Sequence, residues 1–430
     1  MNKLSDYPLF TVIIPQKDRG EYLIHTLRTC MIQDYPNFEI IVSDDCSEDN
    51  SVEVVRELMN KDSRIKLFAH DHHLGMRDNF EFALNQVRPG YVMALGGDDG
   101  LVPGCIWRMF EILSETNREL LTWPLAGFIY SDHKGGKNIF YIKRKKNYGV
   151  KFLKSEDFLN KIAKTFLYQI NECPMFYMKG VASTALVDRV KSRTKDNSFY
   201  NCPTPDGFSG VVLAGEVEDF AFTHEPLSIV GITNKSQGGN YHRTDKKSRE
   251  EAQQFFNDNI RKTMHVELAS QQYSPLETLM TADFLLTARD LPGWPGKFAP
   301  ISFEALIRAS FKLIEKNPFE NEVLVRELNI LKEIAKQHGL LDLFNQLLVT
   351  TKRKVVRMED VYGFVITHSI RFEGTELGIN NIFDASLATN FVYNFYNKIS
   401  FKEIIALIRN TCRILIRIRK YKEENLPNIN

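Results

Sequence analysis

The sequence has few of the features that mark a disulfide-bonded, zinc-binding or membrane-spanning protein. Its six cysteines are scattered with no Cys-x-x-Cys pair, so neither a zinc site nor a disulfide framework is indicated. No stretch approaches the roughly 18 uninterrupted apolar residues of a spanning helix, and the first residues lack the apolar core of a signal peptide. A net charge of +1 gives no electrostatic reason to expect a nucleic-acid partner. We therefore expect a cytoplasmic protein that binds no nucleic acid.

The N-terminal part, by contrast, has a clear pattern of strands and helices. The chain has 430 residues, 43% hydrophobic and 25% charged, enough for two or three globular domains. Over about the first 130 residues, short apolar runs alternate with segments whose apolar residues recur at helical spacing. The expected strands are Phe10–Pro15, Phe38–Ser43, Ile65–Ala69 and Tyr91–Leu95. Because these runs are apolar on both faces, the sequence predicts an α/β fold with a mostly parallel sheet flanked by helices.

Polar side chains follow three of these strands directly. The three groups are Gln16–Arg19, Asp44-Asp45 and Asp98-Asp99. In parallel α/β sheets, ligands bind beyond the carboxyl ends of the strands, so the three groups are expected to converge on one site. The last pair follows two glycines, and adjacent carboxylates suit a divalent cation that carries phosphates. The alternative is an ordinary strand-to-helix turn, in which Asp and Gly are common.

Three motifs in this order resemble the family 2 glycosyltransferases, which have the GT-A fold. Thr11–Arg19 resembles the family's opening strand, which usually ends Pro-x-Tyr-Asn-Arg. Val42–Asp49 resembles its Val-Asp-Asp-Gly-Ser-x-Asp turn, and Leu95–Asp99 occupies the place of its Leu-Asp-x-Asp-Asp metal motif. Each motif is weak alone, but their order and spacing together are specific. The resemblance covers roughly residues 9–245 and implies a nucleotide-sugar donor, with a UDP-sugar expected. We expect residues 1–245 to form a GT-A domain.

The sequence departs from the family pattern at four positions. Lys17 and Asp18 replace the usual Tyr-Asn, and Cys46 replaces the glycine of the turn. Gly96 replaces the first aspartate of the metal motif, which leaves one carboxylate fewer for a cation. We therefore expect the cation to be held weakly without the diphosphate of the donor.

The resemblance implies a bound Mn²⁺ or Mg²⁺ ion, because a cation must neutralise the charge that builds on the diphosphate leaving group. Asp99 is expected as the principal ligand, and Asp98 as a ligand of the ion or a contact of the ribose. His242 lies where some GT-A enzymes supply a third ligand, and the favoured alternative is a plain loop histidine.

The donor nucleotide is expected to contact residues near the first two strands. Pro15, Lys17 and Asp18 correspond to the family's nucleotide-binding opening motif. Asp45 is expected to accept from the base imide or a ribose hydroxyl. Arg77 could approach the base or the diphosphate, or lie as a solvated helix arginine.

The catalytic base is expected later in the domain. Direct displacement needs one carboxylate close to the acceptor hydroxyl, and the Pro205-Asp206 dipeptide stands where related bacterial transferases place their base. Asp206 is therefore the candidate, against a plain turn aspartate as the alternative. Glu218-Asp219 ranks second because it follows the expected helix and lies too near the closing strand of the domain.

Two further segments have open interpretations. The cluster His70–His73 contains potential metal ligands but is expected to be a solvated loop, since such clusters are only compositional hints. Residues 246–430 are expected to form a mainly helical second domain. Its last helix, at about 400–423, is basic and amphipathic, which is typical both of a helix on an anionic membrane and of one docked on the protein's own core.

The function expected from these features is an inverting, metal-dependent glycosyltransferase that extends a bacterial surface glycan. Its acceptor would be a glycan or a lipid-linked glycan, which would suit a peripheral position on the cytoplasmic face of the membrane. A nucleotidyltransferase is the first alternative, although the Gly-rich loop usual after the first strand of that class is missing here. A GT-A-like scaffold without turnover is the second, and Gly96 is its best support.

Overall fold

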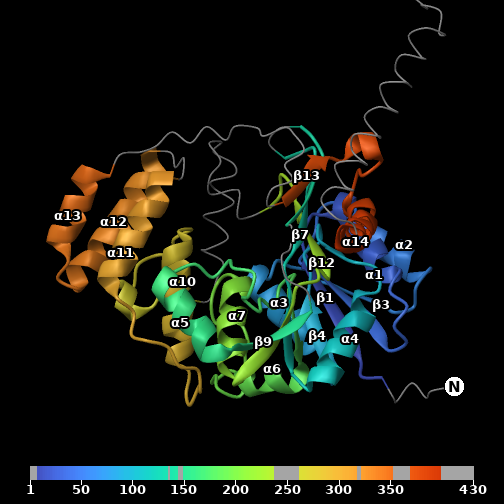
Figure 1. The fold of residues 1–430 in the computed structure, drawn as a ribbon, viewed down its shortest axis with the longest axis horizontal. Helices are drawn as coiled ribbons and strands as arrows, with labels where there is room; N and C mark the ends of the chain where they lie inside the picture. The colour runs from blue at the N-terminus through green and yellow to red at the C-terminus, as the bar shows by residue number, and fades with distance from the viewer. Residues whose placement is uncertain are drawn as a thin grey trace, which may run out of the picture.

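The computed structural model describes residues 7–133, 136–143, 149–236, 261–316, 321–351 and 369–398. Two β-sheets flanked by helices occupy its centre (Figure 1). The helices α10–α13 gather on one side, and α14 lies beside α1 on the other (Figure 1). Among the described residues, no helix is long and apolar enough to cross a membrane.

The four strands expected at the N-terminus are confirmed. They are β1 (Phe10–Gln16), β2 (Phe38–Asp44), β3 (Ile65–Ala69) and β4 (Tyr91–Ala94). All pairings among them are parallel, in the order β3-β2-β1-β4, and the register sets Gln16 opposite Asp44. Every residue of β1 and β2 is buried. The carboxyl ends of these strands therefore meet at one edge of the sheet, as the sequence predicts.

The first sheet continues beyond β4 with mixed strand directions. It has eight strands in the order β3-β2-β1-β4-β10-β6-β11-β9, and β10 is antiparallel to both of its neighbours. The four added strands are β6 (Leu120–Thr122), β9 (Val150–Lys154), β10 (Gly180–Ser183) and β11 (Asp219–Thr223). A second sheet has the order β13-β8-β7-β12-β5. Its strands are β5 (Gly100–Leu101), β7 (Ala126–Ile129), β8 (Ile139–Lys143), β12 (Ser228–Ile232) and β13 (Ser369–Glu373).

Helices cover both faces of the first sheet, which explains its doubly apolar strands. One face carries α1 (Gly20–Met31), α2 (Ser51–Met59) and α4 (Cys105–Thr116). The other carries α3 (Met76–Asn85), α5 (Ser155–Thr165), α6 (Thr184–Lys191) and α7 (Pro205–Gly215). Alternate residues of β1 point to the two cores, Val12 and Ile14 to the first and Ile13 to the second. The central strands are thereby buried on both sides, which fixes their register.

The helical part beyond residue 261 packs against the first sheet's helices. It comprises α10 (Glu277–Arg289), α11 (Phe303–Lys316), α12 (Asn321–Gln337) and α13 (Leu341–Thr350), with the short 3₁₀ helix η2 (Val266–Leu268) before them. These helices share an apolar cluster of their own. α10 lies against α7, so the helical part contacts the helix that carries Asp206.

The last described elements return to the N-terminal part. Strand β13 pairs with β8, the 3₁₀ helix η3 (Thr375–Leu377) follows, and α14 (Ile382–Lys398) packs on α1. The domain boundary expected near residue 245 and the terminal helix expected at about 400–423 lie outside the described residues. Both stay predictions, although β13 and α14 pack on β8 and α1 of the N-terminal part.

Candidate active site

The ends of β1 and β2 are tied together by a tight turn. The backbone amide of Asp45 donates to Gln16 O at 2.9 Å, and the Gln16 amide group contacts the Asp44 carboxylate. Asp44 also accepts from the backbone amide and hydroxyl of Ser47, at 2.9 and 2.7 Å. Asp44 therefore holds the turn. Cys46, which stands where the family has glycine, adopts a left-handed conformation with φ of 56°.

Of Asp44 and Asp45, Asp45 is better placed to bind a ligand, and its carboxylate also holds the loop after β3. The carboxylate is buried and accepts from the backbone amides of Leu74 at 2.6 Å and Gly75 at 3.1 Å. His73 Nδ1 lies 2.9 Å from Asp45 Oδ2 and 3.2 Å from Lys17 Nζ. Lys17, His73 and Asp45 thus form one polar group at this edge of the sheet.

The histidine cluster lies on a loop, and two of its rings have protein partners. His70 Nε2 lies 3.0 Å from the Ser43 hydroxyl and is half-buried, whereas His73 contacts Asp45 and stays exposed. Asp71 and His72 are exposed and pair with each other, as expected. Within the described ranges, no three His, Cys, Asp or Glu side chains are grouped so as to hold a metal ion.

Asp98 and Asp99 follow β4 and are both buried, at 4% and 1% exposure. Asp98 Oδ2 accepts from Arg19 Nη1 at 2.8 Å and from the Thr233 hydroxyl at 3.1 Å. Asp99 accepts from the backbone amides of Gly96 and Gly231, each at 2.9 Å. Asp98 and Asp99 therefore lie between the end of β1, which supplies Arg19, and the end of β12.

The electrostatics of this pair favour an added positive charge. Burial, and after it the neighbouring charge of Asp98, raise the pKa of Asp99 to about 7. Arg19 is the cation in contact with Asp98. Two adjacent carboxylates in a buried site are costly to ionise together, and a divalent cation would relieve that cost.

The missing carboxylate at position 96 has a packing reason. A Cβ atom on Gly96 would lie 2.5 Å from the Tyr177 hydroxyl oxygen and 2.7 Å from Asp99 Oδ2. Tyr177 also hydrogen-bonds Asp99. The space that a side chain at position 96 would need is therefore taken by groups that hold Asp99.

The residues present fit a Mg²⁺ or Mn²⁺ ion that is shared with a diphosphate. Carboxylate oxygens are the ligands that these ions prefer, and they commonly use one or two carboxylates with phosphates and waters. Asp98 and Asp99 are the described residues that could hold the ion. His242 lies outside the described residues, so its role stays a prediction.

Asp206 lies in the first turn of α7, directly after Pro205 at the start of the helix. The Tyr168 hydroxyl donates to Asp206 Oδ2 at 3.0 Å, whereas Oδ1 is buried without a hydrogen-bond partner. Burial raises the pKa of this carboxyl, which makes it a stronger base. A short link connects it to the metal candidates, because Ser209 of α7 accepts from the Phe176 amide and the next residue, Tyr177, contacts Asp99.

Several other candidates have structural partners. Asp18 accepts from the Glu48 backbone amide at 2.7 Å, and Pro15 is a buried residue of β1. Arg77 Nε donates to Tyr200 O at 2.7 Å and its Nη1 lies 2.5 Å from Asp78.

The second-ranked base candidate is also occupied. Asp219 begins β11 and forms an ion pair with Arg118. This pairing favours a structural role for Asp219, so Asp206 stands as the candidate base.

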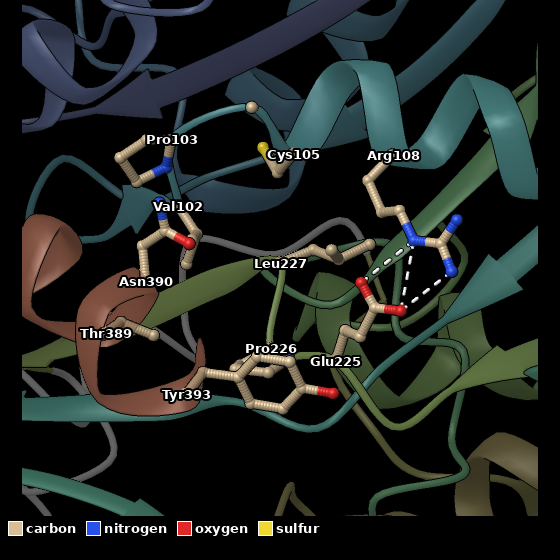
Figure 2. Close-up of a pocket in the computed structure, with 11 residues that line it drawn as sticks. Val102, Pro103, Cys105, Arg108, Glu225, Pro226, Leu227, Thr389, Asn390 and Tyr393 are labelled. Atoms are coloured by element: carbon tan, nitrogen blue, oxygen red, sulfur yellow. Dashed lines mark hydrogen bonds and ion pairs between the residues drawn. The ribbon is translucent and has the colours of Figure 1, made fainter. Parts of the chain in front are cut away.

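A small cavity lies apart from these residues. It has a volume of about 150 Å³ and lies between the turn before α4, the start of β12 and α14 (Figure 2). Its charged lining is the ion pair of Arg108 and Glu225, whose closest atoms are 2.8 Å apart. None of the predicted site residues lines this cavity. The candidate site is therefore the group of side chains at the ends of β1, β2 and β4.

The comparisons agree with the motifs. The model of glycosyl transferase family 2 matches residues 11–169, so over this segment the chain is similar to that family. An uncharacterized glycosyltransferase of Haemophilus influenzae is 33% identical over 92 residues, which cover 21% of this chain and 37% of the relative. The GalNAc(5)-diNAcBac-PP-undecaprenol beta-1,3-glucosyltransferase of Campylobacter jejuni is 33% identical over 109 residues, covering 25% of this chain and 35% of the relative.

The chain thus spans well under half the length of these curated relatives. Among solved structures, S. aureus TarS 1-349 in complex with UDP-GlcNAc aligns with a TM-score of 0.44 and 14% identity. That alignment covers 79% of this chain and 90% of TarS 1-349, and it is too distant to carry an inference about function.

Proposed function

We propose that the protein is an inverting, metal-dependent glycosyltransferase that moves a sugar from a nucleotide sugar to a hydroxyl of a growing bacterial surface glycan. The observation that carries this proposal is the buried Asp98-Asp99 pair at the end of β4, within the segment that is similar to glycosyl transferase family 2. Asp206, on a helix linked to the same pair through Tyr177, completes the set of groups that such a reaction needs.

The donor would lie along the carboxyl ends of β1, β2 and β4. Asp45, with Lys17 beside it, would contact the base or ribose, and Asp98 would contact the ribose or the cation. Pro15, Asp18 and Arg77 are retained as weaker candidates, because the latter two already have protein partners. From the motifs we expect a UDP-sugar.

Asp99 and Asp98 would hold Mn²⁺ or Mg²⁺ together with the diphosphate. When bound, the cation supplies positive charge where the leaving diphosphate becomes more negative. The raised pKa of Asp99 supports this role, because a carboxyl that is costly to ionise alone gains most from a nearby cation.

Asp206 would take the proton of the acceptor hydroxyl while that oxygen attacks the anomeric carbon from the side opposite the diphosphate. This single displacement inverts the configuration of the sugar. Its carboxylate is suited to the task because burial raises its pKa and one oxygen has no hydrogen-bond partner.

Our proposal for the class of acceptor is based on the name of a relative. The name of the C. jejuni protein describes glucosyl transfer on GalNAc(5)-diNAcBac-PP-undecaprenol, a glycan joined to a lipid. A glycan or lipid-linked glycan acceptor is therefore our proposal here, with the enzyme peripheral on the cytoplasmic face of the membrane.

The test begins with a thermal-shift screen of UDP-, GDP- and CMP-sugars with Mn²⁺, since a bound ligand raises apparent stability. Release of the nucleoside diphosphate is then measured for wild type, Asp99→Ala and Asp206→Asn. We expect both variants to lose most turnover, Asp206→Asn by about 10²–10⁴-fold. Full activity in both would refute the assignment. Pyrophosphate release from a nucleoside triphosphate and a sugar phosphate would indicate a nucleotidyltransferase, and UDP binding that Mn²⁺ does not strengthen would indicate a scaffold.

A further inference from the structure

The helical part of the chain reaches the candidate base through two neighbouring residues. The Tyr168 hydroxyl donates to Asp206 Oδ2 at 3.0 Å, and Gln169 Nε2 donates to the Tyr168 hydroxyl oxygen at 3.1 Å. The backbone amide of Gln169 donates to Glu277 Oε1 at 2.9 Å, and Glu277 is the first residue of α10. A continuous path of three hydrogen bonds therefore joins α10 to Asp206.

The direction of these hydrogen bonds follows from the chemistry of the hydroxyl group. A tyrosine hydroxyl has one proton, so accepting from Gln169 leaves that proton free to point at Asp206. A hydrogen bond to a carboxylate is stronger than one between neutral groups. The arrangement therefore stabilises the ionised form of Asp206 and fixes which of its oxygens is left without a hydrogen-bond partner.

Close packing leaves the Tyr168 ring no room to turn away. Tyr168 is 1% exposed, and its ring meets that of Phe284 on α10 edge to face at 5.3 Å. A Cβ atom on Gly207 would lie 2.2 Å from Phe284 Cε2 and 2.8 Å from Tyr168 Cδ2. Only a glycine next to Asp206 allows both rings to approach this closely, so Tyr168 is locked between α7 and α10.

We propose that Tyr168 is a positioning residue for the base: it holds one oxygen of Asp206 so that the other faces the acceptor, and Glu277 of α10 holds Tyr168 in place through Gln169. This inference rests on the proposed function in taking Asp206 as the base. The helical part then acts as a fixed support for the catalytic carboxylate. It also gives the second part of the chain a role in the reaction.

The charged and titratable groups around Asp206 are few. Tyr168 donates to it, Glu277 faces it from α10, and the Cys173 thiol lies nearby. Burial raises the pKa of Asp206, and hydrogen bonds from the Gly207 backbone, Tyr168 and Thr204, in that order of effect, oppose that rise. Removing the hydroxyl should therefore raise the pKa of Asp206 further, by about one unit.

The experiment compares Tyr168→Phe with Tyr35→Phe in the full-length protein. Tyr35 is also buried, and its hydroxyl donates to Pro8 O far from the site, so it is a matched loss of one buried hydroxyl. Two readouts are used. The first is the pKa of Asp206, followed by NMR with aspartate labelled with carbon-13 at the carboxyl group and assigned with Asp206→Asn. The second is the pH profile of nucleoside-diphosphate release from the donor found in the screen.

We expect Tyr168→Phe to raise the pKa of Asp206 by about one unit and to move the acidic limb of kcat/KM to higher pH. We also expect kcat to fall about tenfold, with KM for the donor little changed. Glu277→Ala should act in the same direction more weakly, and Glu277→Gln, which keeps the acceptor oxygen, should restore the wild-type values. Tyr35→Phe should change neither readout.

The outcomes separate the two proposals. If no donor is turned over by the wild-type protein, the proposed function fails, and the NMR titration still decides whether Tyr168 controls Asp206. If Tyr168→Phe leaves both the pKa and the pH profile where Tyr35→Phe leaves them, the positioning role is overturned.

Discussion

Substituting Gly96 with alanine tests how the candidate metal site is built. The new Cβ would meet the Tyr177 hydroxyl oxygen at 2.5 Å and Asp99 Oδ2 at 2.7 Å, so one or both must move. Moving Asp99 strains or breaks its 2.9 Å hydrogen bond from the Gly96 amide. A hydrogen bond to a charged group contributes about 1.5–3 kcal/mol, and overpacking costs about 1–3 kcal/mol. Because moving Asp99 relieves part of the overpacking, the two costs do not add in full, and we expect the free energy of unfolding to fall by about 2–4 kcal/mol.

The neighbouring Gly97 provides the control. Its Cβ would meet only side-chain atoms of Arg19 and Gln16, the nearest at 3.1 Å, and the arginine side chain can adjust. Gly97→Ala should therefore cost less than about 1 kcal/mol. Urea denaturation gives the stabilities, and calorimetry gives UDP affinity with and without Mn²⁺. Gly96→Ala should also lose most of the affinity that Mn²⁺ adds. If Gly96→Ala matches Gly97→Ala in stability and in Mn²⁺-dependent binding, the packing argument for a glycine at this position is wrong.

Three other substitutions give independent tests. Burial raises the pKa of Glu327 to about 7, so its carboxyl binds its proton more tightly in the folded state. The protonated Glu327 carboxyl therefore contributes fully to the free energy of unfolding below about pH 4, and this contribution is lost as the pH rises to 7. Across that pH range, the free energy of unfolding of the wild type should therefore fall by about 2–3 kcal/mol relative to that of Glu327→Gln, as measured by urea denaturation at each pH. Parallel plots of unfolding free energy against pH for the two proteins would contradict this. Cys46→Gly should raise the unfolding free energy by about 0.5–1 kcal/mol, because it relieves a positive φ of 56°; a lower melting temperature would count against strain at Cys46. Asp219→Asn should keep turnover within about twofold of wild type while weakening the contact with Arg118; a loss as large as that of Asp206→Asn would reverse the ranking of the two bases.

The sequence was sufficient for the parts of the fold whose signals are local. Strands β1 to β4 are short apolar runs bounded by polar or turn residues, and the bounds of each were predicted to within one residue. The three polar groups at the strand ends could be expected to meet, because parallel strands end at one edge of the sheet. Asp45, Asp98 and Asp99 are indeed buried near that edge.

The remaining site contacts come from residues far apart in the sequence. Thr233 binds Asp98 and Gly231 binds Asp99 across more than 130 positions, and neither carries a local motif. Gly96 was interpreted as a missing carboxylate because a sequence does not show that Tyr177 fills the space. His73 is exposed as expected, but its contact with Asp45 was missed because the path of its loop depends on the amides that Asp45 holds.

The return of α14 to α1 also bears on how the chain folds during synthesis. Ile382 at the start of α14 is fully buried, and its backbone amide donates to the Tyr130 hydroxyl at 3.2 Å. Its apolar cluster includes Tyr22 of α1 and Ile370 of β13. At about 5–20 residues per second, the ribosome would need roughly 20–70 seconds between completing α1 and completing α14. During that interval this face of α1 is uncovered, so the nascent N-terminal part would depend on chaperones or on transient contacts to avoid aggregation.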